Sequence, residues 1–258
     1  MDLSQIKGVI LDMDGVLWRE KSPLIDMPAT FTEMRRRGWK IVLATNNSTK
    51  TPAAYQALIR DFGVDLEESQ ILTSSQAVAD LLHRKFPMGG PVYVVGETGL
   101  QVALAERGFY LTDSYPVAVV VGIDRQINFE KLRTATLLIR AGAKFYATNP
   151  DRTFPTPEGL IPGAGALLAA LEASTDQSPI IAGKPHPAIL EVALQRLGTR
   201  PEATLMVGDR LETDILGGQN AGCKTALVLS GVTTREMALQ AQPGPDFIAE
   251  DLHQLVLS

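Results

Sequence analysis

The sequence has 258 residues, enough for one large α/β domain or for two domains. With 45% hydrophobic and 21% charged residues, its composition is that of an ordinary globular protein. A formal net charge of -5 gives no electrostatic footprint for nucleic acid, and no apolar run is long enough to span a bilayer, so we expect neither partner. Cys223 is the only cysteine, which excludes an intrachain disulfide. Because the first residues also lack the apolar segment of a signal peptide, we expect a cytoplasmic protein.

The stretch Gly8–Leu17 begins with a short apolar run and continues with Asp12, Met13, Asp14 and a glycine. Such a run is typical of a strand buried on both faces of a parallel sheet. Ligands bind at the C-terminal ends of such strands, and two carboxylates there suit metal-assisted chemistry on a phosphate ester. An ordinary turn after a strand explains the same residues equally well. The choice therefore depends on the rest of the chain.

A helix is expected through Phe31 to Arg37, and a second buried strand follows at Lys40–Ala44. This strand is followed directly by four polar residues, Thr45, Asn46, Asn47 and Ser48. A threonine hydroxyl can donate to a phosphoryl oxygen, and the next backbone N–H groups offer an anion-binding nest. A simple helix cap accounts for these residues too. The recurrence of phosphate-compatible groups after a second strand favours a ligand site.

The middle of the chain changes pattern after helices expected at Ala53–Asp61 and Ser75–His83. A Gly- and Pro-rich break at Phe86–Pro91 precedes a new alternation of strands and helices. The expected elements are strand Val92–Val95, helix Gly99–Arg107, strand Val117–Val121, helix Phe129–Ala141, strand Lys144–Ala147, loop Asn149–Gly165 and helix Ala166–Ala173. We therefore expect an inserted α/β domain over 81–178, and a hydrolase core made of 1–80 and 179–258.

The last third resumes the first pattern. Short apolar strands are expected at Ile180–Ala182, before Lys184, and at Thr204–Val207, before Asp209. Helix Ile189–Leu197 and strands Thr225–Leu229 and Phe247–Ala249 complete the predicted core. Four predicted strands thus end in residues suited to one site: Asp12 and Asp14, Thr45, Lys184, and Asp209.

These residue types fit phosphoryl transfer, which needs a nucleophile, charge neutralisation and an acid held in position. Mg²⁺ prefers oxygen ligands, which Asp12, the backbone carbonyl of Asp14 and Asp209 can supply. Lys184 can offset negative charge on the nucleophile and the phosphate together. Asp214 is either a further metal ligand or a group that holds a ligand in place, and we favour the second role.

The four segments DMDGV, ATNNS, GKP and GDRLETDI, in this order, resemble the motifs of the haloacid dehalogenase superfamily. The insertion is similar to the large α/β cap of its NagD-like, p-nitrophenyl phosphatase-type subclass. That likeness is carried by VYVVGETGL, NPDRTFPTPEGLIPGAG and GKPHP. The resemblance implies a Rossmann-like core, with a parallel sheet and helices on both faces, and an inserted α/β cap domain.

The resemblance also implies a Mg²⁺-dependent phosphomonoesterase that hydrolyses small phosphorylated metabolites through an aspartyl-phosphate. Asp12 would be the nucleophile, and Asp14 the general acid that later becomes the base. The other implied roles are phosphate binding by Thr45, Asn46, Asn47 and Ser48, steadying of the phosphate by Lys184, and metal binding by Asp12, Asp14 and Asp209. The namesake dehalogenases lack the second aspartate of the first motif, so Asp14 argues for phosphate esters over carbon–halogen bonds.

Two other functions use the same residues. A phosphotransferase or phosphomutase would pass the phosphate to a second hydroxyl, and a non-catalytic protein would only bind phosphorylated metabolites. The second is disfavoured because every catalytic position is filled. Substrate specificity is expected in the cap stretches Gly122–Asn128, where Gln126 replaces a histidine of related vertebrate phosphatases, and Asn149–Gly163. Caps of this type often carry dimer contacts, so a homodimer through the cap is expected.

Overall fold

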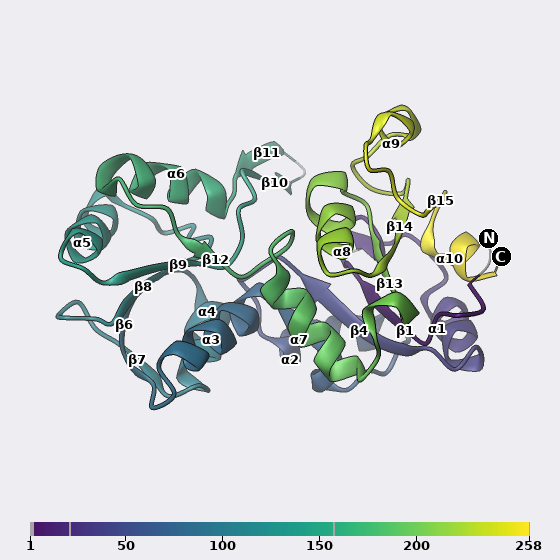
Figure 1. Ribbon diagram of the computed structural model, residues 1–258, viewed down its shortest axis with the longest axis horizontal. Coiled ribbons are helices and arrows are strands. Elements are labelled where there is room, and N and C mark those ends of the chain that lie inside the picture. Colours follow the sequence, from purple (N-terminus) through teal and green to yellow (C-terminus); the bar gives the residue numbers. More distant parts are fainter. Residues whose placement is uncertain (1–2, 21, 157, 258) are drawn as a thin grey trace. The chain divides into compact units, whose positions relative to one another are not determined.

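The computed structural model describes residues 3–20, 22–156 and 158–257 (Figure 1). Contacts divide the chain into two compact units. The first unit comprises the chain up to Thr45, Pro52–Leu72, and the chain from Lys184 onward; the second comprises Asn46–Thr51 and Thr73–Gly183. In the part of the chain that the structure describes, no helix combines the length and the apolar character needed to cross a membrane.

The first unit is built on a six-stranded sheet with the order β15-β14-β13-β1-β4-β5 (Figure 1). Its strands are β1 (Gly8–Leu11), β4 (Lys40–Thr45), β5 (Ile71–Thr73), β13 (Thr204–Gly208), β14 (Lys224–Val228) and β15 (Phe247–Ala249). Strands β15 to β4 pair in parallel, and Leu11 lies opposite both Leu43 and Val207. Residues of β1 and β13 are buried throughout, as continuous apolar runs in a parallel sheet predict.

The strand order reverses at β1. From β1 the chain moves to β4 and β5 on one side, and after the second unit it returns to β13, β14 and β15 on the other. Residues that follow β1, β4 and β13 therefore lie at the carboxyl edge of the sheet at its switch point. Ligands bind at this place in open α/β sheets.

Helices of the first unit are α1 (Met27–Arg36), α2 (Pro52–Asp61), α7 (Pro187–Leu197), α8 (Leu216–Asn220), α9 (Arg235–Gln240) and α10 (Leu252–Leu257). Helix α1 begins after Asp26, whose Oδ1 accepts a hydrogen bond from the Ala29 N–H at 3.0 Å. It buries Phe31 and Met34 in the core and packs against α10, while α7 packs against β4. Burying one such side chain stabilises the fold by about 1.5–3 kcal/mol.

The second unit contains a five-stranded parallel sheet with the order β12-β9-β8-β6-β7. Its strands are β6 (Gly90–Val95), β7 (Phe109–Leu111), β8 (Ala118–Val121), β9 (Lys144–Ala147) and β12 (Ile180–Ile181), and its helices are α3 (Ser74–Lys85), α4 (Thr98–Ala105), α5 (Phe129–Arg140) and α6 (Ala164–Thr175). A separate antiparallel hairpin joins β10 (Thr153–Thr156) to β11 (Gly159–Pro162).

The boundaries between the two units differ from those expected from the sequence, which placed the inserted domain at 81–178. Strand β12 pairs in parallel with β9, so it belongs to the second sheet and does not continue the first. The N-terminal turn of α3 is also tied to the second unit, because the Ser74 hydroxyl donates to the Asn46 carbonyl at 2.6 Å. Lys184 therefore follows a strand of the other sheet, and only three of the four expected strand ends lie in the first one.

Two stretches expected to be loops form hairpins. The stretch Asn149–Gly165 contains β10 and β11, with Phe154 opposite Ile161. The polar stretch Trp18–Pro28, for which the sequence predicts a loop, contains β2 (Trp18–Arg19) and β3 (Ser22–Pro23), with Trp18 opposite Pro23. In both hairpins the strands are short and contain or adjoin prolines, so the sequence shows no alternating pattern typical of a strand.

Candidate active site

Lys184 lies buried at the carboxyl edge of the first sheet, with 1% of its surface exposed. Its Nζ lies 2.6 Å from Asp12 Oδ1 and 2.7 Å from Asp214 Oδ1. It also donates to the Ala44 carbonyl of β4, at 2.9 Å. The ammonium is thus held between two carboxylates, and one of them is the first residue after β1, as the sequence predicts.

Asp209 follows β13 and is fixed by the loop after β14. Its Oδ2 accepts the Val232 N–H at 2.8 Å, and its backbone carbonyl accepts the Thr233 N–H at 3.2 Å. Gly15 and Gly231 pack so closely on this carboxylate that a Cβ at either position would overlap it. Asp209 Oδ1 is buried and has no hydrogen-bond partner among the described residues.

Asp214 lies in a π-helical turn, η3 (Leu211–Ile215), between β13 and α8. Single π-turns of this kind occur often at functional sites. Asp214 Oδ2 accepts the Arg210 N–H at 3.1 Å, while Oδ1 pairs with Lys184. A Cβ on Gly208 would overlap the Asp214 side chain, so close packing also sets its position.

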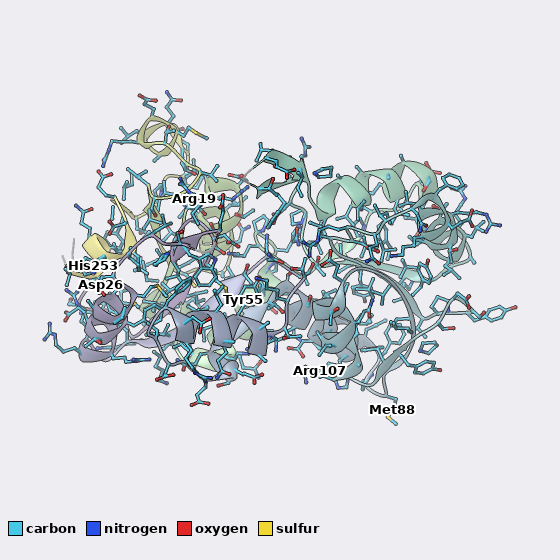
Figure 2. The ribbon with its side chains drawn as sticks, turned by 180° about the vertical axis from the view of Figure 1, so that it is seen from behind. Arg19, Asp26, Tyr55, Met88, Arg107 and His253 are labelled. Atoms are coloured by element: carbon cyan, nitrogen blue, oxygen red, sulfur yellow. The ribbon has the colours of Figure 1, made fainter. Side chains whose placement is uncertain are left out.

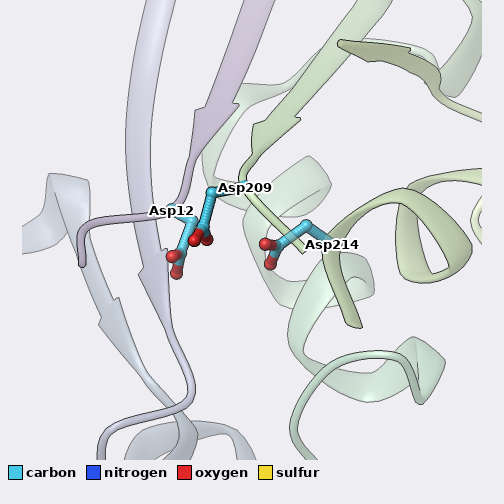
Figure 3. A group of neighbouring side chains, drawn as sticks. All are labelled: Asp12, Asp209 and Asp214. Carbon is cyan, nitrogen blue, oxygen red and sulfur yellow. The ribbon is translucent and has the colours of Figure 1, made fainter. Parts of the chain in front are cut away.

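Asp12, Asp209 and Asp214 form one buried carboxylate cluster (Figure 3). One oxygen from each residue lies within 4.8 Å of the others. The first two side chains lie side by side, and the third faces them from the turn after β13 (Figure 3). Lys184 pairs with two of these three carboxylates, Asp12 and Asp214, so the ionised cluster holds more negative than positive charge in a buried place.

The pKa values express this surplus of negative charge. Burial, followed by the neighbouring Asp214 carboxylate, raises the pKa of Asp209 to about 7. Burial also raises the pKa of Asp12 well above its ordinary value, although the Lys184 ammonium acts in the opposite direction. Burial alone lowers the pKa of Lys184, but the Asp12 and Asp214 carboxylates outweigh it and raise that pKa above its usual value. Lys184 therefore stays a cation at neutral pH.

Asp14 lies on the turn that leaves β1, and its side chain is bound to a tryptophan. The Trp18 indole Nε1–H donates to Asp14 Oδ1 at 3.0 Å. Thr45 is the last residue of β4 and is buried at the same edge of the sheet. Its side chain lies close to the hydroxyl of Tyr55, a proximity that sequence spacing does not indicate.

Asn46, Asn47 and Ser48 follow Thr45 directly in the chain, but their contacts are made within the second unit. Asn46 Nδ2 donates to Asp151 Oδ1 at 3.1 Å. Asn47 Oδ1 accepts both the backbone and the hydroxyl donors of Thr49, at 3.0 and 2.8 Å, and so closes a local turn. The Ser48 carbonyl accepts the Ser75 hydroxyl at 2.9 Å.

Gln126 is exposed in the loop between β8 and α5, where its backbone N–H donates to Asp124 Oδ1 at 2.8 Å. The hydrogen bond described for Gln126 involves its backbone, so its role in specificity stays a prediction. No sequence pattern indicated that Gly15 and Gly231 pack on Asp209, or that Trp18 donates to Asp14. The sequence alone does not show which side chain packs into the space that a Cβ on a turn glycine would occupy.

Family models match two stretches of the chain. Residues 9–110 match the model described as haloacid dehalogenase-like hydrolase, and residues 181–255 match a second one, HAD-hydrolase-like. An acid sugar phosphatase of Staphylococcus aureus is 36% identical over 255 residues, which is 98% of each chain.

The chain belongs to the haloacid dehalogenase-like hydrolases. Among solved structures of this family, a p-nitrophenyl phosphatase from Archaeoglobus fulgidus is 34% identical, with 98% of each chain covered and a TM-score of 0.92. NagD from Escherichia coli K-12 is 36% identical, with 96% of this chain and 98% of that chain covered and a TM-score of 0.90. A glycerol phosphate phosphatase of Mycobacterium tuberculosis, solved in complex with magnesium, is 32% identical, with 99% and 78% covered and a TM-score of 0.91.

These relatives confirm the fold class and the subclass expected from the sequence. The protein is a NagD-like haloacid dehalogenase-like phosphatase, with a Rossmann-like core and an inserted α/β cap domain. It is an enzyme that hydrolyses phosphoric monoesters.

Proposed function

We propose that this phosphatase is a Mg²⁺-dependent phosphomonoesterase for small phosphorylated metabolites, and that it works through an aspartyl-phosphate on Asp12. The observation that carries the proposal is the buried carboxylate cluster with its single ammonium at the switch point of the sheet. It supplies a positioned nucleophile beside an excess of negative charge, and such a site is suited to a divalent cation and a phosphate ester.

The residues at this edge fit Mg²⁺. Asp209 Oδ1 is buried without a hydrogen-bond partner in the described ranges, and a hard cation that prefers oxygen would satisfy it. Both oxygens of Asp214 are already engaged, one by Lys184 and one by the Arg210 N–H. We therefore assign the metal to Asp12, the Asp14 carbonyl and Asp209, and we assign Asp214 to holding Lys184. When bound, Mg²⁺ would neutralise charge on the transferring phosphate.

The reaction would use two aspartates in two steps. An Asp12 carboxylate oxygen attacks phosphorus while the bond to the ester oxygen breaks, and Asp14 gives its proton to the departing alcohol. Asp14, now a carboxylate, takes a proton from water as the water oxygen bonds to phosphorus and releases Asp12. Lys184 stays protonated in both steps and fixes the Asp12 carboxylate for attack.

Phosphate binding is assigned to Thr45, Asn46, Asn47 and Ser48 together with Lys184. The support is their place after β4, beside the strand that carries the nucleophile. The relatives include an acid sugar phosphatase and a glycerol phosphate phosphatase, and these names favour phosphorylated sugars and polyols as substrates for this chain. We assign specificity to the cap stretches Gly122–Asn128 and Asn149–Gly163.

The deciding experiment measures phosphate release from p-nitrophenyl phosphate with Mg²⁺ and with EDTA. Release that requires Mg²⁺ would support the proposal, and release unchanged by EDTA would contradict it. Adding an acceptor alcohol separates hydrolysis from phosphotransfer, because a phosphotransferase would give less free phosphate than nitrophenol. Thermal stabilisation by a phosphorylated metabolite without turnover would instead indicate a binding protein.

We also propose that the protein acts in the cytoplasm and that it forms a homodimer through the cap. Strand β7 is at the edge of the second sheet and exposes Tyr110 and Leu111. Met88, just before β6, projects from the same unit with 95% of its surface exposed (Figure 2). Light scattering of the wild type is expected to give the mass of two chains, and Leu111→Glu the mass of one. A monomeric wild type would contradict this.

A further inference from the structure

The Trp18 indole N–H donates a hydrogen bond to Asp14 Oδ1 at 3.0 Å. The ring is almost wholly buried, with 2% of its surface exposed. It lies against two other aromatic rings of the first unit, Tyr55 with centroids 6.4 Å apart and Phe62 with centroids 5.9 Å apart. Figure 2 shows Tyr55 within that unit. The packing of its ring against the indole limits the movement of the Trp18 side chain.

Backbone hydrogen bonds within the turn also hold Trp18 close to Asp14. The Gly15 N–H donates to the Trp18 carbonyl at 2.8 Å, and the Leu17 N–H donates to the Met13 carbonyl at 2.9 Å. Trp18 then enters the β2–β3 hairpin opposite Pro23. Ring, turn and hairpin therefore hold the indole N–H at one fixed point relative to β1.

An indole N–H can only donate a hydrogen bond. Asp14 Oδ1 is therefore the acceptor, and this favours a proton on Oδ2 when Asp14 is protonated. Removing the donor takes away one contact that fixes the carboxyl group about its last torsion, which is broad and nearly two-fold.

We propose that Trp18 is a positioning residue for the proton transfers of Asp14. Its indole fixes the plane of the carboxyl group and directs Oδ2 to the oxygen of the leaving alcohol, and later to the attacking water. The inference rests on the proposed function, because it takes the acid and base roles of Asp14 from there. It adds a residue that touches neither substrate nor metal but determines which oxygen of Asp14 carries the proton.

Two substrates separate this role from a structural one. Nitrophenolate leaves well without a proton, whereas the alkoxide of glycerol phosphate leaves poorly and needs general acid catalysis. Because kcat/KM reports events up to departure of the alcohol, it isolates the step in which Asp14 donates its proton. We expect Trp18→Phe to lower kcat/KM for glycerol phosphate at least about 10-fold and for p-nitrophenyl phosphate less than about 3-fold.

Trp39→Phe is the matched control. Trp39 is the second tryptophan of the chain and is also buried, but its ring contacts the Arg37 guanidinium at 5.5 Å and not an aspartate. The same atoms are removed at both positions, so any effect of core packing alone appears in both variants. We expect Trp39→Phe to change kcat/KM for the two substrates by the same factor.

A second variant covers the case in which Trp18→Phe folds poorly. In the Trp39→Phe background, residue 18 is the only tryptophan, so benzothienylalanine incorporated for tryptophan replaces only its N–H by sulfur. The same selective loss on glycerol phosphate is expected there. An equal loss on both substrates, or no loss, would overturn the inference. Failure of the proposed function is seen separately, as a wild type that releases phosphate from neither substrate.

Discussion

The two parallel sheets of this protein treat their acidic residues differently. In the second unit, Glu97 follows β6 and pairs with Arg125 at 2.6 Å, and Asp124 follows β8 and pairs with Lys131 at 2.6 Å. Each of these two carboxylates pairs with a different cation. In the first unit, Asp12 and Asp214 share one cation, Lys184, and the Asp209 carboxylate lies in the same buried cluster.

The pKa shifts have opposite signs in the two sheets. Hydrogen bonds from Arg125 lower the pKa of Glu97, whereas burial and neighbouring carboxylates raise that of Asp209. The same fold pattern, a strand followed by an acid, thus gives a structural ion pair in one unit and an unbalanced cluster in the other. The surplus of negative charge, more than the presence of acids, marks the active site.

The largest expected effect is loss of the nucleophile. Asp12→Asn should lower the rate of phosphate release from p-nitrophenyl phosphate by at least about 10³-fold, because an amide cannot form the acyl phosphate. Glu97→Gln, at the corresponding edge of the second sheet, should keep the rate within about 2-fold of wild type. Full activity in Asp12→Asn would show that the nucleophile lies elsewhere.

Removing the shared cation is expected to affect stability as well as activity. Lys184→Met leaves two buried carboxylates without their partner, and we expect the free energy of unfolding in metal-free buffer to fall by about 3–5 kcal/mol. Arg125→Met breaks an exposed pair and should cost less than about 1 kcal/mol. Urea denaturation compares the two; similar losses would mean that the cluster is no more sensitive than a surface ion pair.

A smaller effect is expected from pH in the absence of metal. The pKa of Asp209 rises from its ordinary 3.8 to about 7 on folding, so the folded state binds more protons than the unfolded state between these values. The contribution of Asp209 to stability is full below pH 4 and is lost as pH rises through about 7. The melting temperature should fall by a few degrees more between pH 5 and pH 8 in wild type than in Asp209→Asn.

Magnesium should reverse this trend, because it binds the ionised carboxylate in competition with protons. We therefore expect the increase in melting temperature on adding Mg²⁺ to be larger at pH 8 than at pH 5. An increase of the same size at both pH values, or the same increase in Asp209→Asn, would contradict the placement of the metal at Asp209.

Strands that carry the site were predictable from sequence because each is a continuous apolar run followed by polar residues. This pattern identified β1, β4 and β13 and, with them, Asp12, Thr45 and Asp209. It failed for β12, since two isoleucines and an alanine before a glycine fit either sheet, and the pairing with β9 decides between them.

The pattern of apolar and polar residues does not predict which side chains come into contact when the chain folds. The sequence predicts that Lys184 offsets charge near Asp12, but not that it pairs with Asp214 at a similar distance. The hydrogen bond from Trp18 to Asp14 depends on how a short turn packs under two aromatic rings, and spacing does not encode that packing.

The glycines around Asp209 have a consequence for how this enzyme can change. A methyl group at Gly231 would displace the Asp209 carboxylate without replacing any reactive residue of the site. Such a variant would keep all its motif aspartates and its lysine and still lose the proposed metal ligand from its position. Catalysis in this protein therefore depends on the absence of a side chain at Gly15 and Gly231 as well as on the reactive groups. A comparison of the reactive residues alone would not detect a variant that had lost activity through a substitution at one of these glycines.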